Sequence, residues 1–164
     1  MQTMGKGFST QELRILQSNF PKLLSDPYFK RTSKETPEYN CISWAMVRSD
    51  RWTQCPAGMK LPQFDGVTWW PPEAENGLDI NCLIDAFEKT GHIICNDGVP
   101  EIGYRKVALY CDHNNHWTHA ARLLSNGFWT SKLGAWIDIQ HGDPYSIEGP
   151  AYGHVYCFMK YPML

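Results

Sequence analysis

The chain has 164 residues, enough for one compact domain with a hydrophobic core of useful size. Hydrophobic residues make up 43% of it and charged residues 20%, a balance that excludes an intrinsically disordered chain. Seventeen acidic and fifteen basic residues give a net charge of -2, without the positive footprint of a nucleic-acid-binding protein. No apolar run approaches the roughly 20 residues that a transmembrane helix needs. We therefore expect neither nucleic acid nor a membrane as a partner.

The N-terminal residues lack the apolar stretch of a secretory signal peptide. Six cysteines are scattered along the chain without a Cys-x-x-Cys pair, and they are too few for a disulfide scaffold: Cys41, Cys55, Cys82, Cys95, Cys111 and Cys157. These features predict a reduced, cytoplasmic protein. A protein exported by a signal-free route, as an effector, would have the same features.

The first predicted element is a helix near the N-terminus. Ser9 and Glu12 have the spacing of a capping box, apolar residues follow at helical intervals, and Pro21 ends the helix. The polar segment over residues 25–39 contains two prolines and is predicted to be irregular.

Two further helices are predicted before the pattern changes. A short, mostly buried helix is expected over residues 40–48, and a loop rich in Pro and Trp over residues 50–72. The apolar residues of 79–89 fall on one helical face, and Gly91 provides the C-terminal cap.

After the third helix the hydrophobic period falls to about two, which is typical of strands. Five strands are predicted, at residues 92–95, 107–111, 117–124, 128–131 and 152–161. A Ser-Asn-Gly turn makes a hairpin of the third and fourth strands. Helices followed by an antiparallel sheet predict a single α+β domain over residues 1–164, without a linker.

Cys41 has the local setting of a nucleophile, because it lies where an irregular segment gives way to a helix. There a thiol faces the positive end of the helix dipole and free backbone N–H groups, which lower its pKa and can bind an oxyanion. The alternative interpretation is a small buried core residue, which we adopt for the other five cysteines.

A thiol nucleophile needs a base, and His119 is the best placed. It lies on a predicted strand between a threonine and two alanines, whose small side chains leave room for a helix or a substrate. His92 and His154 fit structural roles on strands, and His141 lies in a predicted loop.

Residues 111–119 contain one cysteine, one aspartate and three histidines, which are suitable ligand types for zinc. However, the Asn-Asn pair in their middle predicts a turn, with His113 and His116 at an exposed hairpin tip. His119 would then lie about 10 Å from them by strand rise. We predict no metal and no cofactor.

With these residues in place, the sequence resembles the papain-like cysteine peptidase superfamily, and within it the NlpC-type and other bacterial amidase branches. The resemblance is carried by a nucleophile helix, a later histidine strand, a turn and a following strand, at Asn40-Cys41 with Trp44-Ala45, Thr118-His119-Ala120, Asn126-Gly127 and Trp129-Thr130-Ser131. More narrowly, its motifs are similar to those of an uncharacterised bacterial domain family. This similarity covers residues 36–160, the predicted core, and leaves residues 1–35 as an N-terminal extension.

The resemblance implies a papain-like fold, with the nucleophile helix packed on the sheet, and a third polar residue after the histidine strand. That place falls on Ser131, which cannot offer a charge. Asp138 and His141 are the alternatives, and we prefer Asp138 because a carboxylate stabilises an imidazolium better than a hydroxyl does. Papain-like enzymes often carry a Gln before the Cys; here Asn40 either takes that oxyanion-binding place or caps the helix.

The resulting prediction is a cysteine-dependent hydrolase that acts on a peptide-like amide in a peptide or protein substrate, through a thioacyl intermediate on Cys41. Substrate contacts are predicted for Asn40, Trp44, Trp69 and Trp70, although tryptophans are more often core residues. Two alternatives are a transglutaminase-like acyltransferase, in which an amine releases the acyl group, and a catalytically inactive binding domain with the same fold. The oligomeric state is left open.

Overall fold

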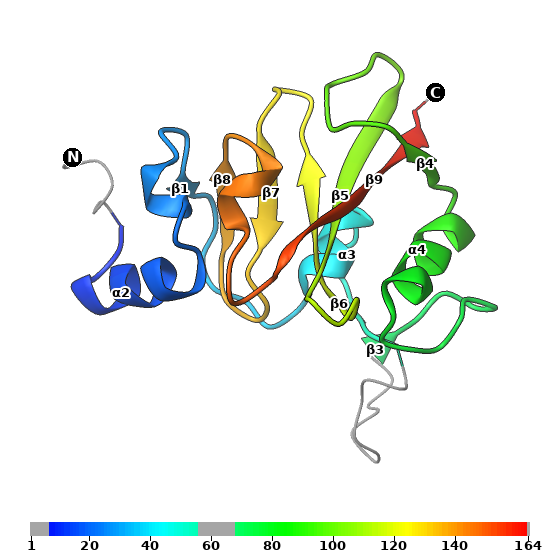
Figure 1. Cartoon of the computed structure of the whole chain (residues 1–164), viewed down its shortest axis with the longest axis horizontal. Helices are drawn as coiled ribbons and strands as arrows, with labels where there is room; N and C mark the ends of the chain where they lie inside the picture. Colours follow the sequence, from blue (N-terminus) through cyan, green and yellow to red (C-terminus); the bar gives the residue numbers. More distant parts are fainter. Residues whose placement is uncertain (1–6, 56–67, 164) are drawn as a thin grey trace.

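The structure of the protein is a computed structural model that describes residues 7–55 and 68–163. Within these ranges the largest element is a sheet of seven strands in the order β1-β8-β7-β6-β5-β9-β4, with every neighbouring pair antiparallel (Figure 1). The strands are β1 (Lys30–Arg31), β4 (Ile93–Cys95), β5 (Tyr104–Cys111), β6 (Trp117–Leu123), β7 (Trp129–Lys132), β8 (Asp138–His141) and β9 (His154–Pro162). Two short strands, β2 (Trp52–Thr53) and β3 (Thr68–Trp69), form a separate parallel pair.

The described helices are α2 (Thr10–Asn19), α3 (Cys41–Ala45) and α4 (Ile80–Lys89), with the 3-10 helices η1 (Leu23–Ser25) and η3 (Pro144–Ile147). The predicted capping box begins α2: the Ser9 hydroxyl accepts from the Glu12 N–H at 3.0 Å, and the Glu12 carboxylate accepts from the Ser9 N–H at 2.8 Å. Asp79 caps α4 by accepting from the Asn81 N–H. Side-chain caps thus satisfy backbone donors that the first turn of a helix leaves free.

Two apolar cores lie on opposite faces of the sheet because successive residues of a strand point to opposite sides. Val107 and Leu109 of β5 pack in the core under α3 and α4. Ala108 and Tyr110 of the same strand pack in the other core, with residues of α2, η1 and η3. Two adjacent residues of β6 divide in the same way, since Ala120 belongs to the first core and Ala121 to the second.

Most of the predicted elements are confirmed. The three helices and the five strands form within about three residues of their expected bounds, and the domain is α+β with an antiparallel main sheet. Two strands differ from the prediction: β1 lies within residues 25–39, predicted as irregular, and β8 includes His141, predicted to lie in a loop. The predicted loop over residues 50–72 contains β2 and β3, while its residues 56–67 lie outside the described residues.

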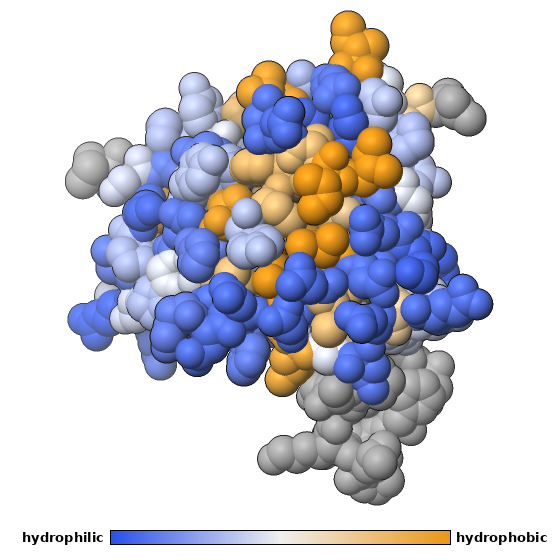
Figure 2. Space-filling model, turned by 45° about the vertical axis from the view of Figure 1, so that its right-hand side comes forward, coloured by the Kyte–Doolittle hydropathy of each residue, from blue (hydrophilic) through white to orange (hydrophobic). Residues whose placement is uncertain are grey.

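Exposed apolar side chains occur on the described surface among mostly hydrophilic residues. Figure 2 shows apolar side chains gathered on the side of the molecule that carries α4 and β4, with hydrophilic side chains around them. On β4, Ile93 and Ile94 are each about half exposed. As for membrane spans, the helices of the described ranges are all too short or too polar to cross a bilayer.

Candidate active site

Cys41 is the first residue of α3, and Asn40 holds the start of this short helix. The Asn40 Oδ1 accepts from the Ser43 N–H at 3.1 Å and the Thr53 N–H at 3.2 Å, and its Nδ2 donates to the Thr53 carbonyl at 2.8 Å. The Ser43 and Thr53 hydroxyls also bond at 2.7 Å. Asn40 is buried and caps the helix, and one of the two Nδ2 hydrogens is used in the bond to Thr53.

The Cys41 thiol is buried, with 8% of the residue exposed. Burial disfavours the thiolate and raises the pKa of the thiol to about 11. The backbone N–H groups of Ala120, Ile42 and Cys41 itself favour the thiolate and lower the pKa, but they do not offset burial. The predicted lowering of the Cys41 pKa is therefore wrong for this arrangement, because the site is dry and α3 is only five residues long. The thiol is protonated at neutral pH.

His119 is fully buried on β6 and begins a chain of hydrogen bonds. Its Nε2 lies 2.9 Å from the Ser131 hydroxyl oxygen, which lies 2.9 Å from the Nε2 of His141. The His141 Nδ1 lies 2.8 Å from the backbone carbonyl oxygen of Asp143. The chain thus links three neighbouring strands, β6, β7 and β8, and ends on a backbone acceptor.

The final acceptor determines where each proton of this chain lies. A carbonyl oxygen can only accept, so His141 carries its proton on Nδ1 and its Nε2 accepts from the Ser131 hydroxyl. Ser131 in turn accepts from the Nε2–H of His119. Burial lowers the pKa of His141 to about 4 and that of His119 well below its usual value, so both rings are neutral. His119 is left with an unprotonated Nδ1, and this buried atom has no hydrogen-bond partner among the residues described.

Tyr152 lies beside His119. Its ring stacks on the His119 ring at 4.0 Å with planes 7° apart, and burial raises the pKa of its hydroxyl well above the usual value. The β6–β7 ladder ends at the Arg122–Thr130 pair, and the backbone N–H of Ala120, two residues before Arg122, interacts with the Cys41 sulfur. Cys41 therefore approaches β6 from the α3 face and His119 projects from the other face. The described residues include no hydrogen bond between the two side chains.

Asp138 does not reach His119, which corrects our preference for it as the third residue. Its Oδ2 accepts from the Tyr39 hydroxyl at 2.7 Å, and burial raises the pKa of its carboxyl above the usual value. The reason is strand alternation: on β8, Asp138 points to the face that carries Tyr39, whereas His141, three residues later, points to the face of His119. Ser131 and His141 are the residues that the structure brings to His119.

The tryptophans predicted to contact a substrate pack against other residues of the chain. The Trp44 Nε1 donates to the Thr130 hydroxyl at 3.0 Å, and the Arg122 guanidinium lies 4.1 Å from the Trp44 ring. Trp70 stacks on Trp117 with ring centroids 5.8 Å apart. Trp44 therefore packs as part of α3, and Trp70 packs against the core that α3 shares with α4.

Trp69 is similarly engaged, with the Arg51 guanidinium 4.8 Å from its ring. Trp69 and Trp70 are half-buried and pack against the core that includes Cys41. At the predicted hairpin tip, His113 and His116 are exposed as expected. No group of three or more metal-ligating side chains occurs in the described ranges.

The sequence did not single out Tyr152, and it placed His141 in a loop. Tyr152 begins the last predicted strand, but only the fold shows that its ring covers His119. The alternation of polar and apolar residues in Asp-Ile-Gln-His is a strand signal that could have found β8, and with it the inward direction of His141.

This fold and site define a class: an α+β domain with a buried thiol at the N-terminus of a helix and, on the strand that this helix contacts, a buried neutral histidine bonded to a Ser–His pair. Residues 30–160 match the family described as a domain of unknown function, DUF7689, and the chain belongs to this family. Searches of curated proteins and of solved structures find no match to the chain.

Proposed function

We propose that the protein is a cysteine-dependent amide hydrolase of papain-like type, with Cys41 as nucleophile and His119 as base. The observation that carries this proposal is the His119–Ser131–His141 chain, which leaves the His119 Nδ1 unprotonated and without a partner among the described residues, on the strand that Cys41 contacts. A buried nitrogen without a partner costs stability, so its retention needs an explanation. A role as proton acceptor for the thiol provides one.

The reaction follows from these groups. Cys41 and His119 leave β6 on opposite faces, so substrate binding must first bring the two side chains within hydrogen-bond reach. The Cys41 thiol proton then passes to the His119 Nδ1, and the thiolate attacks the carbonyl carbon of an amide. Backbone N–H groups at the start of α3 and at Ala120 stabilise the negative oxygen of the tetrahedral intermediate. The His119 imidazolium then protonates the leaving amine, and water releases the acyl group from the sulfur.

Ser131 and His141 act through His119 as positioning residues. They hold the His119 ring in the tautomer with a bare Nδ1, the role that an Asn or Asp has in related triads. Neither residue carries a charge here, so the imidazolium gains less stabilisation than a carboxylate would give. We therefore expect a slower enzyme than one with a Cys-His-Asp arrangement.

Labelling with a peptide vinyl sulfone, an electrophile that resembles a peptide amide, tests the proposal. Intact-mass and peptide-level spectrometry should show a single adduct on Cys41. His119→Ala should slow this labelling by about 10²–10⁴-fold, the usual contribution of a general base. Cys157 is the control, because it lies on β9 without a histidine of this kind and is more exposed than Cys41, so access alone would favour its labelling. Labelling at equal rates on both cysteines, or labelling that His119→Ala leaves unchanged, would contradict the proposal.

A second candidate function is a catalytically inactive binding domain, and the burial of the site favours it. Cys41 is 8% exposed and His119 is 0% exposed, so a substrate must displace part of the cover before it can meet the sulfur. A peptide mixture incubated with wild type and with Cys41→Ala separates the two functions. Cleavage by the wild type alone supports the hydrolase, and identical product profiles support the binding domain.

A further inference from the structure

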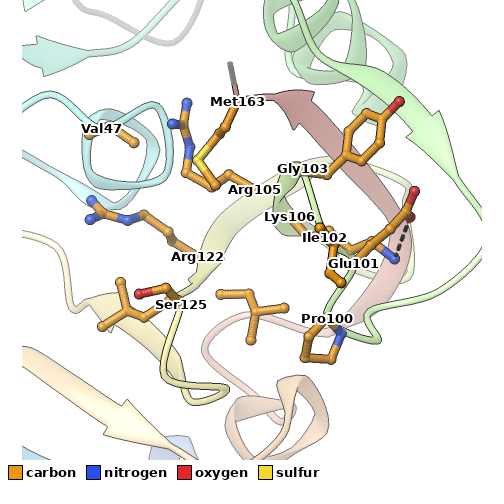
Figure 3. A pocket seen from close by; sticks show the side chains of 13 residues that line it. Val47, Pro100, Glu101, Ile102, Gly103, Arg105, Lys106, Arg122, Ser125 and Met163 are labelled. Atoms are coloured by element: carbon orange, nitrogen blue, oxygen red, sulfur yellow. Dashed lines mark ion pairs between the residues drawn. The ribbon is translucent and has the colours of Figure 1, made fainter.

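A second site lies away from Cys41 and His119, in a cavity of about 510 Å³ at the ends of β5 and β6 (Figure 3). Residues of the loop before β5, the turn after β6 and the C-terminal Met163 line it. Its wall includes two arginines, Arg105 of β5 and Arg122 of β6. Neither is part of the proposed hydrolase site, so the inference below does not rest on the proposed function.

The sheet places these two arginines side by side on one face. Val107 pairs with Arg122 across β5 and β6, and Arg105 precedes Val107 by two residues, so it points to the same face. The two arginines are therefore diagonal neighbours, a spacing of about 7–8 Å between Cα atoms that lets long side chains meet. In Figure 3 both side chains extend from the strands toward Val47.

Each guanidinium is packed on one face but incompletely hydrogen-bonded at its edge. Arg105 lies 4.6 Å from the centre of the Tyr161 ring, and Arg122 lies 4.1 Å from that of Trp44. The Arg122 Nη1 donates to the Trp44 carbonyl at 3.2 Å. The Nε atoms of both arginines are buried without a hydrogen-bond partner in the part of the chain that the structure describes. Aromatic packing thus holds both groups, and the Nε–H of each is left without an acceptor among the described residues.

The two positive charges have no acidic partner within ion-pair distance among the described residues. The neighbouring Lys106 differs, because its Nζ lies 2.9 Å from Asp97 and 3.4 Å from Glu101. Burial, and then the charge of Arg105, lower the pKa of Arg122. An arginine stays protonated in spite of such a shift, so the pair favours a bound anion.

We infer that this cavity binds a small organic oxyanion: a carboxylate or phosphate head group carried by an apolar body. A guanidinium holds either head group through two N–H groups at once, and both arginines of the cavity wall have a donor without an acceptor among the described residues. The remaining wall is largely apolar and includes Val47, Ile102, Leu124 and Met163. These side chains would contact the apolar body, and burial of its apolar surface would favour binding.

Calorimetric titration of the full chain with three probes tests the inference. N-acetyl-L-leucine offers a carboxylate, monobutyl phosphate offers a phosphate, and N-acetyl-L-leucinamide has the apolar body without the charge. At least one of the two anions should bind with one-to-one stoichiometry, and which of them binds identifies the head group. The amide should bind about tenfold or more weakly, because it cannot form charge-assisted hydrogen bonds. Absence of binding by both anions, or equal binding of the amide, would overturn the inference.

Variants locate the binding site. Arg105→Gln removes one open fork and should weaken the anion about tenfold or more, whereas Arg14→Gln removes the same charge from the exposed face of α2 and should change nothing. If Arg105→Gln does not fold, Arg122→Lys, which keeps the charge but loses the fork, is expected to weaken binding in the same way. On the wild type, NMR shifts on titration should concentrate at Val47 and Ile102. Shifts elsewhere, or equal affinity of Arg14→Gln and the cavity variant, would refute the assignment.

Discussion

Ser131 is the residue on which the arrangement of the candidate site depends, because its hydroxyl serves two imidazoles at once. It accepts from His119 and donates to His141, both at 2.9 Å, in a fully buried place. A hydroxyl is well suited to this position since it both donates and accepts. A carboxylate there would accept only, and it would change the tautomer of His141 or draw protons onto both rings. The uncharged chain is consistent with the low pKa values of the two histidines.

Replacement of this hydroxyl tests the chain directly. Ser131→Ala leaves the Nε2 atoms of His119 and His141 buried without a partner, at a cost of ~1–3 kcal/mol for each. We expect the free energy of unfolding, measured in urea, to fall by about 2–4 kcal/mol. The rate of Cys41 labelling by the vinyl sulfone should fall as well, because the His119 ring loses its fixed tautomer.

Asp138→Asn is the matched control for that variant, since it changes a buried polar residue on the neighbouring strand but leaves the chain intact. It keeps an oxygen that can accept from the Tyr39 hydroxyl, so labelling of Cys41 should stay within about twofold of wild type, as for a change outside the hydrogen-bond network. Should Asp138→Asn slow labelling as much as Ser131→Ala does, the role assigned to Ser131 is wrong.

At the scale of the elements, local signals in the sequence predicted the regular helices and strands, and long-range pairing decided the rest. The capping box of α2, the apolar face of α4 and the apolar run of β5 are each readable from neighbouring residues. Strand β8 has only a weak local signal, the alternation in Asp-Ile-Gln-His, because Asp138 and His141 are polar and yet buried. Their burial is made possible by Tyr39 and Ser131, which are distant in sequence or lie across a strand pair.

The same distinction applies to the candidate site. The position of Cys41 at a helix start and of His119 on a strand followed from their immediate neighbours. The hydrogen bond from Ser131 to His141 depends on the register of β7 and β8, in which Ser131 lies opposite Ile139. No local pattern specifies that register. The pKa of Cys41 also could not be predicted, because it is determined by how deeply the fold buries the sulfur.

Gly153, just before β9, controls how closely that strand approaches β5. It has φ +72°, and a Cβ at this position would overlap the carbonyl oxygen of Cys111. The next residue back is Tyr152, whose ring stacks on His119. Gly153→Ala should therefore lower the free energy of unfolding by about 3 kcal/mol or more, through backbone strain and the overlap together. It should also move Tyr152 away from His119.

Gly127→Ala is the appropriate comparison in the same unfolding experiment. Gly127 has φ +88° in the turn between β6 and β7, and a Cβ there has no neighbour within 4 Å. Gly127→Ala should therefore lower the free energy of unfolding only by the cost of the left-handed backbone conformation, about 1–2 kcal/mol. Equal losses for the two variants would show that the close approach of Gly153 to β5 has no energetic consequence.

At the scale of the whole molecule, the sheet separates two cores, and the candidate site has one side chain on each side of it. Cys41 belongs to the core under α3 and α4, while the surroundings of His119, Tyr110 and Tyr152, belong to the other. Both cores exclude water, which explains why a thiol and two imidazoles of one small region are all neutral. We therefore expect the buried histidines of this interior to lower the stability of the fold together when the pH falls.

Three histidines buried in a neutral state determine how stability depends on pH. Burial is the main cause of their low pKa values, about 4 for His92 and His141 and well below 6.5 for His119. Below pH 6.5 the unfolded chain binds protons that the folded chain does not. The free energy of unfolding therefore decreases as the pH is lowered from about 6.5 to 4, by up to about 1.4 kcal/mol per pH unit for each histidine. Urea unfolding of the wild type across this range should show the decline. His141→Gln should flatten it, although it is less stable at neutral pH, whereas His113→Gln at the exposed hairpin tip should leave the slope unchanged. A stability that stays constant from pH 7 to pH 4 would mean that these rings are not held neutral, and that the Nδ1 of His119 is not the free base that the proposed reaction requires.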